Sequence, residues 1–210
     1  MVSDRMKLLL LKIMMVGEGM KKRVLTVTII MALFLLSACG QKLEGALDWP
    51  IEEFKFTNHS GETYSLNDLD GKVWVADFIF TNCADVCPPM TANMKKLQDM
   101  VKEEGLENVE FVSFTVDPEV DTPEVLKAYG EQFHVDFSNW NFLTGYGQKD
   151  IETFAMDNFK TIVVKPEEGD QVVHQTYFYL VDQDGKIQKQ YSGLNDIPFE
   201  EIISDIKTIQ

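Results

Sequence analysis

Apolar residues along this chain follow two different periods, and the change from one to the other predicts its secondary structure. Residues 73–80 form a nearly continuous apolar run, which is typical of a central strand covered on both faces, and Asp77 is its one charged residue. Residues 109–116 predict a second strand, and residues 140–143 predict a short third one. The chain is therefore expected to build its core on buried strands.

Helical periodicity follows each of these strands. Residues 88–105 open with two prolines, which suit a first helical turn, and then place apolar side chains on one face until Gly105. Residues 123–133 and 149–159 predict two further helices, and residues 198–209 close the chain as an amphipathic helix.

Two segments have the pattern of hairpins. Residues 54–65 alternate around a polar turn, and residues 177–181 and 186–191 flank an Asp-Gly turn. The order of elements predicts a thioredoxin-like α/β fold, with a central mixed sheet flanked by helices and an N-terminal hairpin. No repeat or linker interrupts residues 51–210, so we expect a single domain there.

The first 38 residues have the features of a signal peptide. A basic triplet at residues 21–23 precedes an uncharged apolar run, which at about twelve residues is too short to cross a membrane. Leu-Ser-Ala then precedes Cys39, as in the lipobox of bacterial lipoproteins, where the cysteine is lipidated and becomes the new N-terminus. An ordinary secretory signal with a chance cysteine is the alternative.

Lipidation of Cys39 would place the domain outside the cytoplasm, anchored in the cell membrane, with residues 39–50 as a lipidated tether. We expect residues 1–19 not to be translated. Their Gly17-Glu18-Gly19 needs purine-rich codons just before Met20, which resemble a ribosome-binding site.

The charge of the processed chain excludes one class of function. Removing residues 1–38 takes away six of the 19 basic residues and two of the 34 acidic ones, which leaves 13 against 32 and a net charge of −19. A nucleic-acid-binding protein needs a basic face to neutralise phosphates, so that role is excluded. We expect a lysine-rich partner surface to dock here, and the lipid to hold the protein at the membrane.

Chemistry concentrates at two cysteines, Cys83 and Cys87, which follow the central strand. We expect them to share one helical turn, with side chains directed to the same side and free N–H groups favouring the thiolate. Outside the cytoplasm such a pair is a disulfide, a metal site, or a site that alternates between the two. A purely structural disulfide is disfavoured, because so short a loop stabilises little.

Two thiolates need a third donor to hold a metal, and the chain has three histidines. His59 lies in a polar hairpin turn and is expected to be solvated. His134 lies near a helix C-terminus, where its charge suits the helix dipole. His174 lies just before the apolar strand at residues 177–181, at the edge where thioredoxin-like proteins bring a loop over the cysteines, and is the preferred ligand.

Other residues near the pair have plainer interpretations. Asp85 is expected to be solvated, and Asp117 to be a turn residue. Asp77 is a candidate for a group beside the site. Met90 and Met94 repeat at helical spacing and are expected to pack in the core.

Three stretches resemble the Sco/SenC family of copper proteins. They are FIFTNCADVCPPMTANM (residues 78–94), FTVDPEVDTPEVLKAY (114–129) and HQTYFYLVDQDGKI (174–187). The resemblance extends from about residue 50 to 205, and the joint occurrence of CxxxCP, SxxxDPxxDTP and a distant histidine before YFYLVD is specific.

This resemblance implies that Cys83, Cys87 and His174 bind copper, as Cu(I) or Cu(II). It implies a role in assembling the copper A centre of cytochrome c oxidase. The implied partners are subunit II of the oxidase and either another copper chaperone or a thiol reductant. Two thiolates and one imidazole are a soft donor set that suits copper, whereas structural zinc normally takes four ligands.

Other functions would use the same cysteines. A dedicated thiol-disulfide oxidoreductase would form a Cys83–Cys87 disulfide while reducing the copper-ligand cysteines of the oxidase subunit. Against it, thioredoxins have CxxC rather than CxxxC, and residues 175–177 lack their cis-proline. A peroxiredoxin-like peroxidase would need an arginine, and Arg5 and Arg23 lie in the signal peptide. A structural lipoprotein with an inert disulfide is the third alternative.

Overall fold

The computed structural model describes residues 43–169 and 171–210. The predicted signal peptide and Cys39 lie outside these residues. Within the described part, eight strands form one sheet in the order β1-β10-β9-β4-β5-β6-β2-β3, and β7 and β8 form a separate two-stranded ribbon. None of the helices described is long and apolar enough to cross a membrane.

Three parallel strands form the centre of the sheet. They are β4 (Val73–Ile79), β5 (Val109–Thr115) and β6 (Trp140–Thr144), and the first two are paired from Val73↔Val109 to Ile79↔Thr115. Every residue of β4 is buried, which confirms the prediction of a strand covered on both faces.

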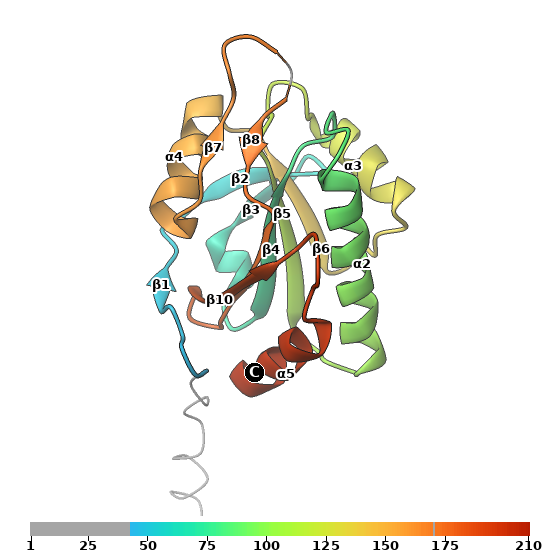
Figure 1. Cartoon of the computed structure of the whole chain (residues 1–210), viewed down its shortest axis with the longest axis vertical. Helices are drawn as coiled ribbons and strands as arrows, with labels where there is room; N and C mark the ends of the chain where they lie inside the picture. Colours follow the sequence, from blue (N-terminus) through green and yellow to red (C-terminus); the bar gives the residue numbers. More distant parts are fainter. Residues whose placement is uncertain (1–42, 170) are drawn as a thin grey trace, which may run out of the picture. The chain divides into compact units, whose positions relative to one another are not determined.

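Helices cover both faces of this sheet (Figure 1). They are α2 (Cys87–Glu103), α3 (Pro123–Gln132), α4 (Gln148–Phe159) and α5 (Phe199–Ile209). Parallel strands joined by right-handed crossovers place α2 and α3 on one face, and Figure 1 shows α4 on the other. The predicted thioredoxin-like α/β fold, a mixed sheet flanked by helices, is confirmed.

Antiparallel strands extend the sheet on both sides. The N-terminal hairpin consists of β2 (Lys55–Asn58) and β3 (Thr63–Ser65), and the 3-10 helix η2 (Leu66–Leu69) follows it. The late hairpin consists of β9 (Tyr177–Val181) and β10 (Lys186–Ser192), and β9 pairs with β4. Both hairpins lie where the alternating patterns predicted them.

The end of the predicted tether packs against the domain. Strand β1 (Trp49–Pro50) pairs with β10, the side chain of Leu43 is buried, and the Leu47 N–H donates to the Gln188 carbonyl at 2.9 Å. Burial of the apolar side chains at residues 43–51 favours this arrangement. A tether that reaches residue 50, as predicted, is therefore too long.

Aromatic side chains fill the core beside the central strands. Phe78 stacks on Phe114 with ring centroids 5.5 Å apart, and Phe159 meets Phe78 edge-on at 5.0 Å. Each fully buried side chain of this size contributes roughly 1.5–3 kcal/mol. Close packing of aromatic side chains therefore stabilises the C-terminal ends of β4 and β5.

The ribbon of β7 (Val163–Val164) and β8 (Val173–His174) was not predicted. Its two pairs, Val163↔His174 and Val164↔Val173, are too few to give a period in the sequence. We call these two strands, with the described residues between them, the histidine ribbon. Figure 1 shows its connecting loop extending beyond the sheet.

Candidate metal centre

The two cysteines lie where β4 gives way to α2. Helix α2 begins at Cys87, and Cys83 lies in the turn before it, so the prediction that both share one helical turn is wrong. The Cys87 N–H donates to Cys83 Sγ at 3.3 Å. In a helix that included Cys83 the same N–H would donate to the Cys83 carbonyl. Both residues are buried, free thiols.

The two thiols differ in acidity. Burial by itself raises the pKa of Cys83, but interactions with His174 and Cys87 outweigh burial and lower the pKa to about 6. Burial, followed by the hydrogen bond with Cys83, raises the pKa of Cys87 well above its ordinary value. At neutral pH Cys83 is therefore the thiolate, which is the nucleophilic and metal-binding form, and Cys87 carries its proton.

His174 comes to the cysteines from a distant part of the chain. Its Nε2 lies 3.4 Å from Cys87 Sγ, although 87 residues separate the two in sequence. Its Nδ1 lies 2.9 Å from the Gln175 carbonyl, which can only accept, so Nδ1 donates there and Nε2 is the ring nitrogen that faces Cys87. The ring of Phe80 packs edge-on against the imidazole, with centroids 5.8 Å apart.

The chemistry of these donors fits a soft metal ion. A metal about 2.3 Å from sulfur and about 2.0 Å from an imidazole nitrogen keeps these atoms roughly 3.5 Å apart at a tetrahedral angle. The contact between Cys87 and His174, at 3.4 Å, has this spacing. Across the described part of the chain, no three His, Cys, Asp or Glu side chains are already grouped as metal ligands.

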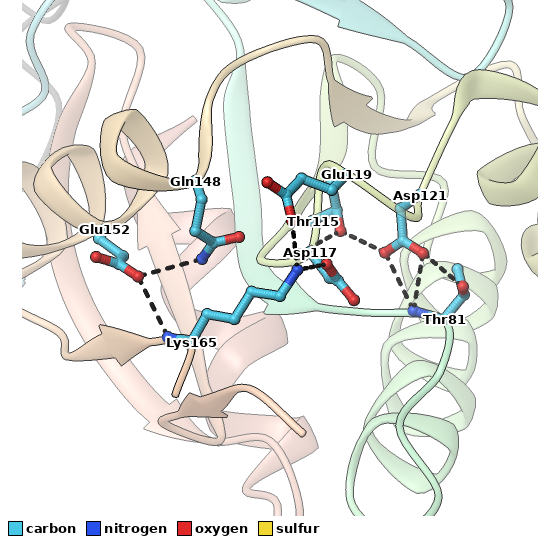
Figure 2. Close-up of polar contacts among 8 residues, drawn as sticks. All are labelled: Thr81, Thr115, Asp117, Glu119, Asp121, Gln148, Glu152 and Lys165. Atoms are coloured by element: carbon cyan, nitrogen blue, oxygen red, sulfur yellow. Dashed lines mark hydrogen bonds and ion pairs between the residues drawn. The ribbon is translucent and has the colours of Figure 1, made fainter. Parts of the chain in front are cut away.

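A buried carboxylate holds the turn that carries Cys83. Asp121 accepts hydrogen bonds from the Thr81 N–H at 3.1 Å and from the hydroxyls of Thr81 and Thr115 (Figure 2). Burial raises the pKa of Asp121, while these donors oppose the shift. We call residues 80–87, which carry both cysteines, the cysteine loop. The turn after β5 thus supports this loop at Thr81, two residues before Cys83.

The same turn also holds the histidine ribbon. Lys165, which follows β7, places its Nζ 2.8 Å from Asp117 Oδ1 and 2.8 Å from Glu119 Oε2 (Figure 2). Asp117 was predicted as a turn residue, and its carbonyl accepts from the Asp121 N–H as expected of a turn. The prediction missed that its side chain is also a buried partner of Lys165.

Two aspartates near the cysteines differ sharply. Asp85 is exposed, as predicted. Asp77 is fully buried, and the Ser113 hydroxyl and the charge of His174 only partly offset the effect of that burial on its pKa. Burial raises the pKa of Asp77 to about 7, and its negative charge contributes to the raised pKa of Cys87. Asp77 therefore lies close to the site.

The structure also places the two methionines and the other two histidines. Met90 and Met94 are fully buried, which confirms that they belong to the core. His134 is exposed just after α3. The prediction that His59 is solvated is wrong, because its ring is buried and stacks on Phe137 with centroids 4.4 Å apart. Burial, and then the charge of Lys127, lowers the pKa of His59 to about 4.

Sequence reasoning missed three residues that support the site. Asp121 had a signal, since it belongs to the quoted SxxxDPxxDTP pattern, but no role was inferred for it. Thr81 and Lys165 had no signal in the sequence, because their contacts depend on how the turn after β5 meets two segments far away in sequence.

The comparisons with known proteins decide the family. The family model described as SCO1/SenC matches residues 48–210. This chain belongs to the SCO1/SenC family. A SCO1 protein homolog of Bacillus subtilis (strain 168) is 50% identical over 176 residues, which cover 84% of this chain and 91% of the relative.

Solved structures of the family agree with the fold. A crystal structure of a SCO1/SenC family lipoprotein from Bacillus anthracis str. Ames has 57% identity and a TM-score of 0.77, covering 80% of this chain and 98% of that one. BsSco, described as a member of the Sco family of cytochrome c oxidase assembly proteins with a disulfide switch, has 50% identity and a TM-score of 0.75 over the same shares. Arabidopsis thaliana ScoI, solved with copper bound, is more distant, at 26% identity and a TM-score of 0.64, covering 75% and 96% of the two chains.

Proposed function

We propose that this SCO1/SenC protein binds one copper ion through Cys83, Cys87 and His174 and delivers it to cytochrome c oxidase. The observation that carries the proposal is the approach of His174 Nε2 to within 3.4 Å of Cys87 Sγ. Two sulfurs and one imidazole nitrogen suit Cu(I) and tolerate Cu(II). Copper in the solved Arabidopsis relative supports the choice of metal.

The acceptor we propose is the copper A centre in subunit II of the oxidase. Transfer of a metal is an exchange of ligands, and a site with only three protein donors leaves a position for the first ligand of the recipient. The description of BsSco as an oxidase assembly protein supports this direction. The net charge of −19 after residue 38 favours a lysine-rich surface on the recipient.

We further propose that lipid on Cys39 anchors the domain to the cell membrane, facing outside the cytoplasm. The lipobox-like residues 36–39 support this, as does the description of the Bacillus anthracis relative as a lipoprotein. Labelling cells with a radioactive fatty acid should mark the protein, and Cys39→Ser should abolish the label. A labelled Cys39→Ser protein would refute the assignment.

A second function is favoured by the unequal acidity of the two thiols. With its pKa lowered to about 6, Cys83 is a thiolate at neutral pH and able to attack a disulfide, after which Cys87 resolves the mixed disulfide. The two electrons reduce the partner's disulfide to two thiols, and Cys83 and Cys87 are oxidised to a disulfide. The disulfide switch described for BsSco supports this alternative, in which the partner is the oxidised copper-ligand pair of subunit II.

Copper titration of the reduced protein tests the proposal. We expect one copper per chain and an intense sulfur-to-copper absorption with Cu(II), both lost in Cys83→Ala and Cys87→Ala. Cells that lack the protein should lose copper A oxidase activity and keep quinol oxidase activity. Wild-type copper binding in either cysteine variant, or normal activity of both oxidases, would contradict the proposal.

A dithiol reductant separates the two functions. If the protein acts only as a reductant, a membrane-permeant thiol should restore oxidase activity to the deletion cells without added copper. Rescue by copper alone favours delivery of the metal.

A further inference from the structure

The histidine ribbon has little of its own to hold it in place. Its strands share two residue pairs, and an isolated pair of strands is at best marginally stable in water. Val164 and Val173 face solvent, with 47% and 60% of their surfaces exposed, while Val163 and Val172 are buried. Apolar burial therefore anchors only one side of the ribbon, and polar contacts must fix the rest of its position.

The strongest of these polar contacts is made by Lys165. Its side chain is 20% exposed, and that of its partner Asp117 is 3% exposed, so water screens their attraction only weakly. Glu119, the second partner, is 69% exposed and contributes much less. The backbone N–H of Lys165 also donates to Glu152 of α4 at 3.2 Å (Figure 2). Lys165 is thus held at both its backbone and its side chain.

The partner of Lys165 belongs to the turn that supports the cysteine loop. Asp117 and Asp121 are joined through the backbone of that turn, and Asp121 holds Thr81. A second tie runs directly between the two segments, since the Gln171 side chain donates to the Asn82 carbonyl at 3.2 Å. One turn therefore sets the positions of both the loop with the thiols and the ribbon with the imidazole.

We infer that the ion pair between Lys165 and Asp117 positions His174 over the two thiols. Lys165 is a positioning residue, because its ammonium group pairs with Asp117 and Glu119 and it acts on His174 only through the ribbon. When the pair is intact, the turn holds Nε2 of His174 within reach of Cys87. When it is broken, the ribbon keeps its buried valines but loses the contact that sets its distance from the cysteine loop. The metal-binding consequence rests on the proposed copper site, whereas the ribbon's position does not.

The first test needs no metal. Amide hydrogen exchange would be measured on the full chain, purified in detergent, for peptides that cover Val163 and His174. We expect Lys165→Met and Asp117→Asn each to speed exchange there by roughly tenfold, because opening of a local unit follows the loss of its stabilising contacts. Lys165→Arg, which can keep the pair, should exchange at the wild-type rate. Unchanged exchange in Lys165→Met would overturn the inference whatever the protein does with copper.

Two controls separate this role from general effects of charge. Glu119→Gln removes the exposed partner of the same lysine and should change exchange less than twofold. Lys102→Met removes an exposed lysine that pairs with Asp136 elsewhere on the domain, and should leave the ribbon unchanged. Equal effects in Lys102→Met and Lys165→Met would contradict a specific role.

The second test uses Cu(II) as the probe. Lys165→Met should weaken Cu(II) binding by roughly tenfold, as loss of a group that orients a ligand commonly does, and should diminish the imidazole nitrogen coupling in the paramagnetic resonance spectrum. The sulfur-to-copper absorption should remain. Faster exchange together with unchanged copper affinity and nitrogen coupling would mean that the pair holds the ribbon without positioning His174, which overturns the inference. Absence of copper binding in the wild type would refute the proposed function and leave the exchange test to decide.

A double variant removes one further ambiguity. Lys165→Met alone leaves the Asp117 carboxylate buried without its partner, which destabilises by itself. Lys165→Met/Asp117→Asn removes both charges, and we expect it to regain stability against urea while the nitrogen coupling stays diminished. Full recovery of that coupling would assign the effect to the buried charge and overturn the inference.

Discussion

The cysteine loop and the histidine ribbon supply the same candidate site but are built in opposite ways. The loop begins at the end of a fully buried strand and ends at the first residue of α2, and its Thr81 donates hydrogen bonds to Asp121. The ribbon is two residue pairs long, shows two valines to solvent, and depends on Lys165 and Gln171. The thiols are thus part of the core, whereas the imidazole is brought to them by the weakly anchored histidine ribbon.

This difference suits the proposed copper site, which would have to both hold and release an ion. Donors that are fixed by the core keep their spacing whether or not a ligand is present, while a donor on a weakly anchored segment can be displaced at low cost. We infer that the cysteines set the capacity to bind and that His174 sets how readily the ion leaves.

The largest effect should come from breaking the support of the cysteine loop. Asp121→Ala leaves the Thr81 N–H and the hydroxyls of Thr81 and Thr115 without their acceptor, and we expect it to lower the free energy of unfolding by about 3 kcal/mol. Urea denaturation measures this loss.

Asp150→Ala is the matched control, because its exposed carboxylate accepts from the Gly147 N–H at the start of α4. Removing it should lower the free energy of unfolding by only about 1 kcal/mol. Equal losses in the two variants would show that the cysteine loop has no special support.

Removing the imidazole should have a smaller effect, which should be confined to copper binding and should leave the stability of the fold unchanged. We expect His174→Ala to weaken Cu(II) binding by roughly ten- to a hundredfold, or about 1.4 to 2.7 kcal/mol, with the free energy of unfolding changed by less than about 0.5 kcal/mol. Copper titration and urea denaturation measure the two quantities. His134→Ala, at an exposed position after α3, is the control and should change neither. A large loss of stability in His174→Ala would mean that the ribbon is part of the core after all.

The smallest effect concerns the pH dependence of the loop. Because the pKa of Cys83 is lowered to about 6, its thiolate persists above that pH and is lost as pH falls through it. The stabilisation that this thiolate gives the fold is complete above the ordinary thiol pKa of about 8.5 and declines as pH falls toward 6. Because Cys87 must also lose its proton to bind, copper affinity should fall by about tenfold per pH unit even above pH 6, and more steeply below pH 6, where protons compete for the Cys83 sulfur as well.

Alkylation of the metal-free protein by iodoacetamide, followed residue by residue with mass spectrometry, measures this pKa. Cys83 should react with a midpoint near pH 6, and Cys87 should stay unreactive to much higher pH. Equal midpoints would contradict the asymmetry between the two thiols.

The core elements could be predicted from the sequence better than the histidine ribbon could, because only the core elements have a repeating pattern. Buried strands and amphipathic helices repeat over many residues, so β4, β5 and α2 could be read from their periods. The ribbon has no period, and the pairing of Lys165 with Asp117 depends on the path of the chain between them. The position of His174 near the cysteines was predicted mainly through a family resemblance rather than through local pattern.

Two of the wrong predictions, those for His59 and for Cys83, have the same origin. His59 lies in a polar turn, which suggested exposure, but Phe137 from the connection between α3 and β6 covers its ring. Cys83 has helical spacing from Cys87, yet its sulfur takes the N–H that a helical carbonyl would take. In both cases a tertiary or side-chain contact replaced what local sequence favoured.

The central claim is that two cysteine sulfurs and one imidazole nitrogen bind the same copper ion. X-ray absorption spectroscopy of the copper-loaded full chain tests it most directly, with His174→Ala measured in parallel. The account predicts two sulfur scatterers and one imidazole nitrogen in the wild type, and loss of the nitrogen alone in the variant. A copper shell without sulfur, or an imidazole signal that survives His174→Ala, would contradict it.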